Sequence, residues 1–203
     1  MIKNLIFDFG DVFINLDKKG AMQNALDLFQ IKEVNSDMNH MNQLYEQGLI
    51  NSTEFLSYYH RTFPHLTNSQ ILDAWNFILK DFPKHRLHFI KSLALKKEYQ
   101  LILLSNTNEL HITWIQDNIP FYEDFKNCFH SFYLSHEIGL RKPNKDIFQF
   151  VIDQNKLNPS ESLFIDDTID NTLTAKNLGF HVWNIDETTE DVANLFTVKK
   201  DLF

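Results

Sequence analysis

The 203-residue sequence has a single cysteine, so it offers no covalent cross-link within the chain, and it carries no excess of positive charge. It contains five glycines, five prolines and one cysteine, and 19 Lys and Arg stand against 27 Asp and Glu, for a net charge of -8. Cys128 alone cannot form an internal disulfide or a thiolate metal site, which is consistent with a reducing cytoplasm. Because no basic stripe could neutralise a phosphate backbone, we expect no nucleic-acid partner.

Long hydrophobic runs are also missing. The first apolar run is interrupted by Asp8 and Asp11, so it is too short for the core of a signal peptide. No other stretch reaches the roughly 20 apolar residues that cross a bilayer. We therefore expect a cytoplasmic chain with no membrane partner, present as a monomer or a weak homodimer.

Four short runs are apolar at every position and are followed at once by polar or turn residues. They occupy residues 5–7, 101–104, 132–134 and 163–165. Strands without alternation are typically buried on both faces, as in a parallel sheet covered by helices. Helical spacing of apolar residues appears between them at 84–97, 145–154 and 170–178. This alternation predicts an α/β fold with a doubly wound parallel sheet.

Residues 16–82 differ from the rest, because they contain amphipathic helical patterns and no credible interior strand. Capping-box spacings begin helices near residues 51 and 67. We predict a helical cap of residues 16–82 over the carboxyl end of the sheet, inserted into an α/β core of residues 1–15 and 83–203. Phenylalanines of the cap, such as Phe55, Phe63 and Phe77, pack between helices or face the cleft.

Polar residues follow each predicted strand. They are Asp8 after the first, Ser105 and Asn106 after the second, Lys142 in the loop after the third, and Asp166 and Asp167 after the fourth. Ligands of open parallel sheets bind at this edge. Three carboxylates at one spot repel one another unless a cation lies between them. Mg²⁺ prefers such hard oxygen ligands, completed by water and a substrate phosphate.

These positions lie in four segments, "FDFGDV", "LLSNTN", "YLSHEIGLRKP" and "FIDDTIDN", in that order. Together with the helical insertion after the first segment, they resemble the haloacid dehalogenase-like (HAD) hydrolases over nearly the whole chain. The chain is most similar to small phosphatases with a four-helix cap, including bacterial sugar-phosphate phosphatases and the phosphatase domain of soluble epoxide hydrolase. The resemblance implies a HAD-like Rossmannoid core, an inserted four-helix cap and Mg²⁺-dependent hydrolysis of a small phosphorylated metabolite, with a sugar phosphate as one candidate.

The resemblance also implies catalytic roles. Asp8 would attack phosphorus and become an aspartyl phosphate. Ser105 and Asn106 would hydrogen-bond the transferring phosphoryl group. Lys142 would hold its negative charge and shield Asp8 from repelling the substrate.

The metal ligands are implied in the same way. Asp8 and Asp167 would bind Mg²⁺ directly. Asp166 would act through water or by orienting Lys142. The main-chain carbonyl of Gly10 would supply another ligand, which requires no side chain.

Gly10 is also a departure from the family pattern. HAD phosphatases usually carry a second aspartate two residues after the nucleophile, where it protonates the leaving alcohol and then activates water. Loss of a general acid typically costs about 10²- to 10⁴-fold in rate. Either Asp11 takes over the proton, or the leaving group needs little protonation, as in an anomeric sugar phosphate, or the chain binds a phosphorylated ligand and hydrolyses it poorly.

Two other functions compete with the phosphatase. A metal-independent dehalogenase of the same fold lacks the second aspartate too, but the pair Asp166 and Asp167 counts against it. A phosphate-binding pseudoenzyme has only Gly10 in its favour. Of the nine scattered histidines, His111 and His136 lie near the predicted site, but solvated surface is the default interpretation for these side chains.

Overall fold

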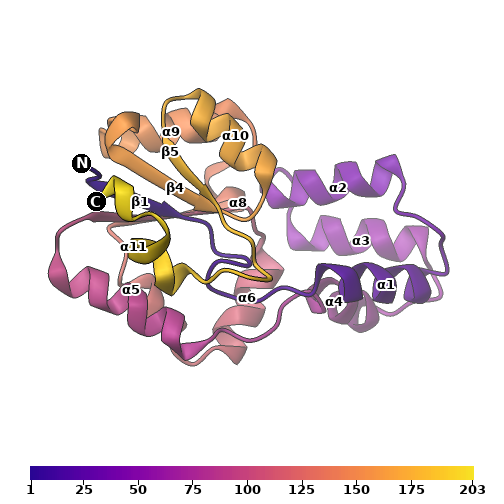
Figure 1. Ribbon diagram of the computed structural model, residues 1–203. Helices are drawn as coiled ribbons and strands as arrows, with labels where there is room; N and C mark the ends of the chain where they lie inside the picture. The colour runs from indigo at the N-terminus through magenta and orange to yellow at the C-terminus, as the bar shows by residue number, and fades with distance from the viewer.

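The computed structural model describes residues 1–203 and contains one sheet of five parallel strands. The strands are β1 (Asn4–Phe7), β2 (Gln100–Ser105), β3 (Ser131–Leu134), β4 (Ser162–Asp166) and β5 (His181–Asn184). Their order across the sheet is β3-β2-β1-β4-β5, so strands are added on both sides of β1; β1, β4 and β5 are labelled in Figure 1. The predicted doubly wound α/β fold is confirmed.

Successive side chains of β1 face opposite sides of the sheet. Leu5 and Phe7 enter one buried cluster and Ile6 enters another. The first cluster is covered by α5 (Lys84–Lys96), α6 (Glu109–Asn118), α7 (Tyr122–Lys126) and α11 (Leu195–Val198). The second lies under α9 (Lys145–Asn155) and α10 (Ile169–Asn177) (Figure 1). Burial on both faces explains why β1 is apolar without alternation.

Aromatic packing anchors the loop that follows β1. The ring centroids of Phe9 and Phe125 are 5.1 Å apart, and those of Phe13 and Phe125 are 4.9 Å apart. Val12 and Ile14 are buried beside them. Because these apolar neighbours pin the loop, the polar residues between them are held at the end of the strand.

Four helices of the insertion form a second packed unit. They are α1 (Lys18–Phe29), α2 (Ser36–Glu46), α3 (Ser52–Thr62) and α4 (Asn68–Asn76), and they lie beside the core at the edge where β1 ends (Figure 1). Their hydrophobic cluster, which includes Phe29, Phe55 and Tyr59, is separate from the two clusters of the core. We refer to α1–α4 as the cap; all four helices fall within residues 16–82.

The two connections between cap and core run side by side. Leu16 and Leu79 form an antiparallel bridge, and the Asn15 N–H donates to the Asp81 carbonyl at 2.9 Å. The Asp17 N–H donates to the Ile78 carbonyl at 2.8 Å. The chain therefore enters and leaves the cap at one place. None of the helices in the molecule has both the length and the apolar character required to cross a membrane.

Candidate active site

The site lies at the point where the strand order reverses, next to β1. β1 pairs with β2 on one side and with β4 on the other, so the chain crosses from one half of the sheet to the other between these strands. Crevices at such switch points are the usual ligand sites of open α/β sheets. Asp8 stands directly after β1 and its N–H donates to the Ile165 carbonyl at 2.9 Å, beside Asp166 at the end of β4.

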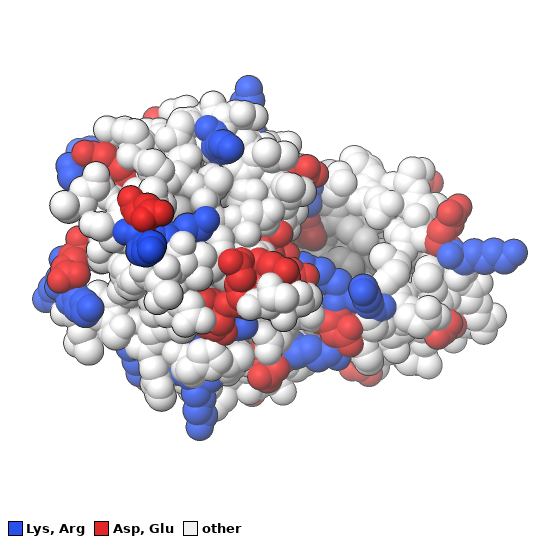
Figure 2. All heavy atoms as spheres, in the orientation of Figure 1, with Lys and Arg blue, Asp and Glu red and all other residues white.

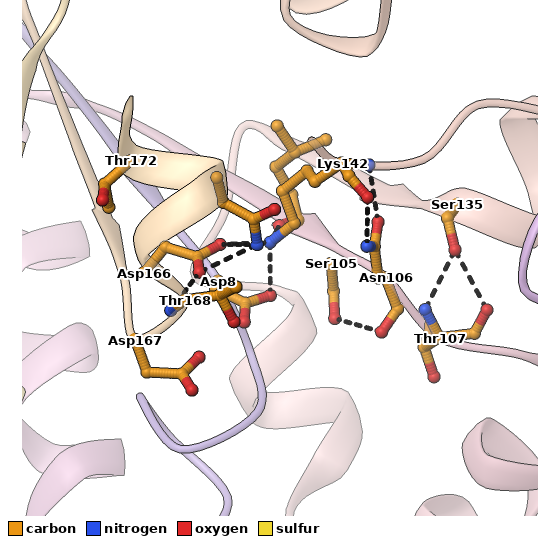
Figure 3. A network of polar contacts seen from close by, with 12 residues as sticks. Asp8, Ser105, Asn106, Thr107, Ser135, Lys142, Asp166, Asp167, Thr168 and Thr172 are labelled. Carbon is orange, nitrogen blue, oxygen red and sulfur yellow. Dashed lines mark hydrogen bonds and ion pairs between the residues drawn. The ribbon is translucent and has the colours of Figure 1, made fainter. Parts of the chain in front are cut away.

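Lys142 occupies the centre of the site, with 1% of its surface exposed. Its Nζ lies 2.6 Å from Asp166 Oδ2 and 2.8 Å from Asp8 Oδ1, and donates to the Leu104 carbonyl at 2.8 Å (Figure 3). Three strand ends thus supply the partners of one ammonium group. The position of Lys142 is fixed by Asn106, whose side-chain amide accepts from the Lys142 N–H at 2.9 Å and donates to its carbonyl at 2.8 Å.

Asp166 is fully buried and its carboxylate is completely engaged. Besides Lys142, it accepts hydrogen bonds from the Thr168 N–H at 2.8 Å and from Asn171 Nδ2 at 3.0 Å to each oxygen. Such a carboxylate orients its neighbours. We therefore expect Asp166 to orient Lys142, which is one of the two roles predicted for it.

Asp167 and Asp11 are joined by a residue of the cap. Lys18 Nζ lies 2.5 Å from Asp167 Oδ2 and 2.7 Å from Asp11 Oδ2. The other oxygen of Asp11 accepts from the Leu16 N–H at 2.8 Å. The Asp11 carboxylate therefore supports the connection between core and cap, and Asp11 does not line the cleft.

At Gly10 the space for a side chain is taken. A Cβ at this position would stand 2.7 Å from Leu16 Cδ1, which is the end of a flexible side chain. Leu16 lines the cleft at this point. A side chain at position 10 would therefore require the Leu16 side chain to move.

Ser105 has the freest polar group of the predicted set. It is buried at the end of β2 and lines the cleft, and its only hydrogen bond is a long one of 3.5 Å to the Asn106 carbonyl (Figure 3). Asn106, in contrast, is occupied with the backbone of Lys142. Within this structure Asn106 is a positioning residue, while the Ser105 hydroxyl is available to a ligand.

Burial and charge set the ionisation of the central pair. Burial, aided by the negative charges of Asp166 and Asp167 and opposed by Lys142, raises the pKa of Asp8 to about 7. Burial alone would lower the pKa of Lys142, but the carboxylates of Asp166 and Asp8 outweigh it and raise that pKa. The raised pKa of Lys142 keeps its ammonium charged.

The donor set suits a hard divalent cation. Carboxylate oxygens of Asp8, Asp166 and Asp167 lie within 4.8 Å of one another, and those of Asp8 and Asp167 have fewer hydrogen bonds than the fully engaged Asp166. Asp8 Oδ1 is buried and accepts no hydrogen bond of good geometry. Two or three carboxylates with no nitrogen or sulfur donor are typical of Mg²⁺ sites rather than zinc sites. The residues present therefore fit the predicted metal.

His111 lies at the boundary between cap and core. Its Nε2 contacts the Trp75 carbonyl at 3.1 Å and its Nδ1 contacts Asn108 Nδ2 at 3.2 Å, an arrangement that places the ring hydrogen on Nε2. Burial lowers the pKa of His111 to about 4 despite the Trp75 hydrogen bond. The neutral imidazole of His111 therefore forms part of the cleft wall, whereas His136 is not among the residues that line the cleft.

Sequence reasoning missed three contributors to the site: Asn171, Lys18 and Glu46. Asn171 was visible, since it lies in the segment "FIDDTIDN" and one helical turn beyond the aspartates. Lys18 and Glu46 belong to the cap, and no sequence pattern indicates which side of a cap helix turns toward the core.

The comparisons with known proteins agree with this geometry. Residues 2–179 match the family model of haloacid dehalogenase-like hydrolases. A D-ribitol-5-phosphate phosphatase of Bacteroides thetaiotaomicron is 31% identical over 192 residues, which cover 90% of this chain and 91% of that protein.

Solved structures give the same result. A HAD family enzyme of Bacteroides thetaiotaomicron, crystallised as an aspartate-to-alanine variant with magnesium and inorganic phosphate, superposes with a TM-score of 0.84. It is 32% identical, and the match covers 97% of this chain and 99% of that one. A predicted HAD-like hydrolase of Porphyromonas gingivalis has a TM-score of 0.81 at 29% identity, over 100% and 98% of the two chains. The protein belongs to the haloacid dehalogenase-like hydrolases.

Proposed function

We propose that the protein is a Mg²⁺-dependent phosphatase of small phosphorylated metabolites that works through an aspartyl-phosphate intermediate. The observation that carries the proposal is the placement of Asp8 at the switch point, against the buried ammonium of Lys142 and beside two further carboxylates. Related proteins described as a sugar-alcohol phosphate phosphatase and as a magnesium and phosphate complex support the same chemistry.

Asp8 supplies the nucleophile. Its carboxylate oxygen forms the new bond to phosphorus while the bond from phosphorus to the leaving oxygen breaks, and water later releases phosphate and restores the carboxylate. The Lys142 ammonium, held within 2.8 Å of Asp8, stabilises the negative charge of the phosphoryl group. The Ser105 hydroxyl donates a hydrogen bond to a phosphoryl oxygen.

Asp8, Asp167 and the Gly10 carbonyl would hold Mg²⁺, which would supply charge neutralisation at the transferring phosphate. Asp166 holds Lys142 and Asn171 in place by accepting hydrogen bonds from both side chains. The Lys18 ammonium bonds Asp167, so this residue of the cap contacts a proposed metal ligand.

The proton of the leaving group is the open element of the mechanism. Asp11 is one candidate acid, but its carboxylate is bonded to the Leu16 N–H and to Lys18. The other possibility is a leaving group that departs without a proton. Replacement of Asp11, described in the Discussion, separates the two.

The test is phosphate release from a panel of phosphate esters with and without Mg²⁺. We expect turnover by the wild type with Mg²⁺, its loss on addition of EDTA, and a loss of at least about 10³-fold for Asp8→Asn, since the step has no other nucleophile. Asp170 is an exposed carboxylate on α10. The control variant Asp170→Asn should therefore retain activity. A wild type that is silent on every ester but binds inorganic phosphate would instead identify a binding protein.

A further inference from the structure

The cleft continues into the cap. A cavity of about 300 Å³ lies among α1–α4, next to the cleft of about 250 Å³ that contains Asp8. The two share four wall residues, which are Lys18, Glu46, Ile78 and His111. Figure 2 shows the hollow between the core and the cap, with charged side chains gathered on its core side and uncharged surface deeper in. A ligand whose phosphate lies at Asp8 therefore has room for its other end inside the cap.

The cavity wall is apolar and rich in aromatic rings. Twelve of its sixteen lining residues are hydrophobic. The Trp75 ring lies 4.6 Å from that of Phe55 and is stacked on His111 at 5.2 Å with an interplanar angle of 24°. Tyr59 packs against Phe55 at 5.0 Å. Walls of this kind favour a flat, apolar ligand group.

Several polar groups at the wall are already bonded within the protein. The Tyr59 hydroxyl donates to Asn42 Oδ1 at 2.6 Å, and both nitrogens of His111 are engaged. Glu46 is paired with Arg141 at 2.9 Å. Lys18, the remaining charged residue of the wall, is paired with Asp11 and Asp167. The wall therefore offers few unpaired groups to a polyhydroxylated ligand, and each hydroxyl left unsatisfied would cost about 1–3 kcal/mol.

The part of the cleft near Gly10, where the leaving oxygen of the substrate would lie, gives an independent indication of the substrate class. Position 10 is a glycine and offers no carboxylate, and Leu16 Cδ1 lies 2.7 Å from where a Cβ of residue 10 would stand. An aliphatic alkoxide is nearly as basic as hydroxide, with water at about 15.7, so its departure needs an acid. A phenol, like the tyrosine side chain, has a pKa of about 10. A phenolate can therefore leave as the anion.

We propose that the substrate is an aryl phosphomonoester whose aromatic group occupies the cap cavity. The inference deepens the proposed phosphatase function and rests on it. Asp8 attacks phosphorus, the bond to the aryl oxygen breaks and its electron pair leaves with the phenolate, which takes a proton from water. Water then cleaves the aspartyl phosphate to give phosphate. At roughly 30 Å³ for each water-sized group, the cavity holds an aromatic body of about ten non-hydrogen atoms.

The experiment compares esters that differ in one property each. 2-Naphthyl phosphate and 2-naphthylmethyl phosphate share the ring system, but only the second has an alkoxide leaving group. We expect kcat/KM to fall by about 10²- to 10⁴-fold from the first to the second, which is the usual contribution of the missing acid. We also expect kcat/KM for D-ribitol 5-phosphate to lie at least tenfold below that for 2-naphthyl phosphate.

A cavity-filling variant tests the location. Ala25 of α1 lines the cavity, so Ala25→Leu should lower kcat/KM for 2-naphthyl phosphate at least tenfold and leave acetyl phosphate, which has no aromatic group, unchanged. Ala21→Leu, at the same wall, provides a second variant if the first fails to fold. Ala94→Leu on α5 is the matched control, because Ala94 is also half-buried but packs against the core cluster.

The outcomes separate the two proposals. Faster turnover of D-ribitol 5-phosphate than of 2-naphthyl phosphate, or indifference to both cavity-filling variants, would overturn the aryl ester and leave the phosphatase intact. No phosphate release from any ester or from the acyl phosphate acetyl phosphate would overturn the phosphatase. In that case calorimetry with 2-naphthol still tests whether the cap cavity binds an aromatic group. Binding that is weaker in Ala25→Leu would support an aromatic ligand, and the absence of binding would reject it.

Discussion

Lys142 shows how one buried residue can connect an entire site. Its ammonium joins Asp8, Asp166 and the Leu104 carbonyl, groups that come from the ends of three strands. A buried charge is tolerated only when its partners are complete. The same contacts therefore hold the strand ends together and position Asp8, the proposed nucleophile.

Replacement of this lysine should damage stability and activity together. We expect Lys142→Met, measured without Mg²⁺ by urea denaturation, to lower the free energy of unfolding by about 3–5 kcal/mol, because two buried carboxylates lose their counter-charge. Lys91→Met is the control, since Lys91 forms an exposed pair with Asp124 and such pairs contribute at most about 1 kcal/mol. Equal losses in the two variants would contradict the central role of Lys142.

Asp11→Asn tests whether Asp11 is the acid. The asparagine oxygen still accepts from the Leu16 N–H, so the variant chiefly removes the charge that faces Lys18. Because Asp11 does not line the cleft, we expect kcat for 2-naphthylmethyl phosphate to change less than about tenfold, with no change in the shape of its pH profile. A loss of about 10²-fold or more with a lost limb of that profile would assign the acid to Asp11.

Gly10→Asp combined with Leu16→Ala is the complementary change. The smaller residue makes room for a carboxylate where Leu16 Cδ1 now lies. We expect the double variant to gain activity on 2-naphthylmethyl phosphate relative to 2-naphthyl phosphate, because an acid assists only the poorer leaving group. Leu16→Ala alone is the control and should leave this ratio unchanged.

Among the secondary-structure elements, α4 and α6 form the main junction between cap and core. The Trp75 indole N–H donates to Asn108 Oδ1 at 3.1 Å, and the Trp75 carbonyl contacts His111. The Leu110 N–H of α6 also donates to the Tyr45 hydroxyl at 3.1 Å. Opening of the cap must break or move these bonds.

The neutral state of His111 predicts a pH effect at this junction. The pKa of His111 is lowered to about 4 in the folded protein, chiefly by burial, against about 6.5 when unfolded. Between these values the unfolded chain binds the extra proton, so stability rises with pH and is lost as pH falls from 6.5 toward 4. We expect His111→Asn to lose less unfolding free energy than the wild type over this window, by on the order of 2 kcal/mol. Parallel curves would contradict this account.

The sequence was most informative where one physical requirement governs each position. Strands buried on both faces need apolar residues throughout, so β1, β2 and β4 were located almost to the residue. Both predicted capping boxes are present, at Asn51 and Thr67. β5 was missed because it is an edge strand in which only Trp183 is buried, which leaves no apolar run to detect.

The site could be predicted in part for the same reason. The strand order brings the carboxyl ends of β1 and β4 side by side. Asp8 and Asp166 therefore meet there, and both contact Lys142. The neighbours of Asp11 and Gly10 depend instead on how the cap connection turns, since Leu16 and Lys18 both belong to it. Long-range placement of this kind leaves no periodic signal.

For the molecule as a whole, metal binding should act on stability. A ligand present at 100 times its dissociation constant stabilises the folded state by about 2.7 kcal/mol. For a chain of this length that corresponds to a rise in melting temperature of about 5–10 °C. We expect this rise with Mg²⁺, its reversal by EDTA and its absence in Asp167→Asn, while Asp170→Asn on the exposed side of α10 keeps it. A rise in both variants would place the metal elsewhere.

The strand order also has a consequence for folding during synthesis. β1 is made first, yet both of its neighbours lie far along the chain, β2 beginning at Gln100 and β4 at Ser162. The four cap helices are complete by Asn76 and contain their own hydrophobic cluster. On the ribosome, local helical contacts can therefore form while β1 still waits for its partners. Asp8 is therefore translated well before Asp166, and its surroundings are complete only after β4 has emerged.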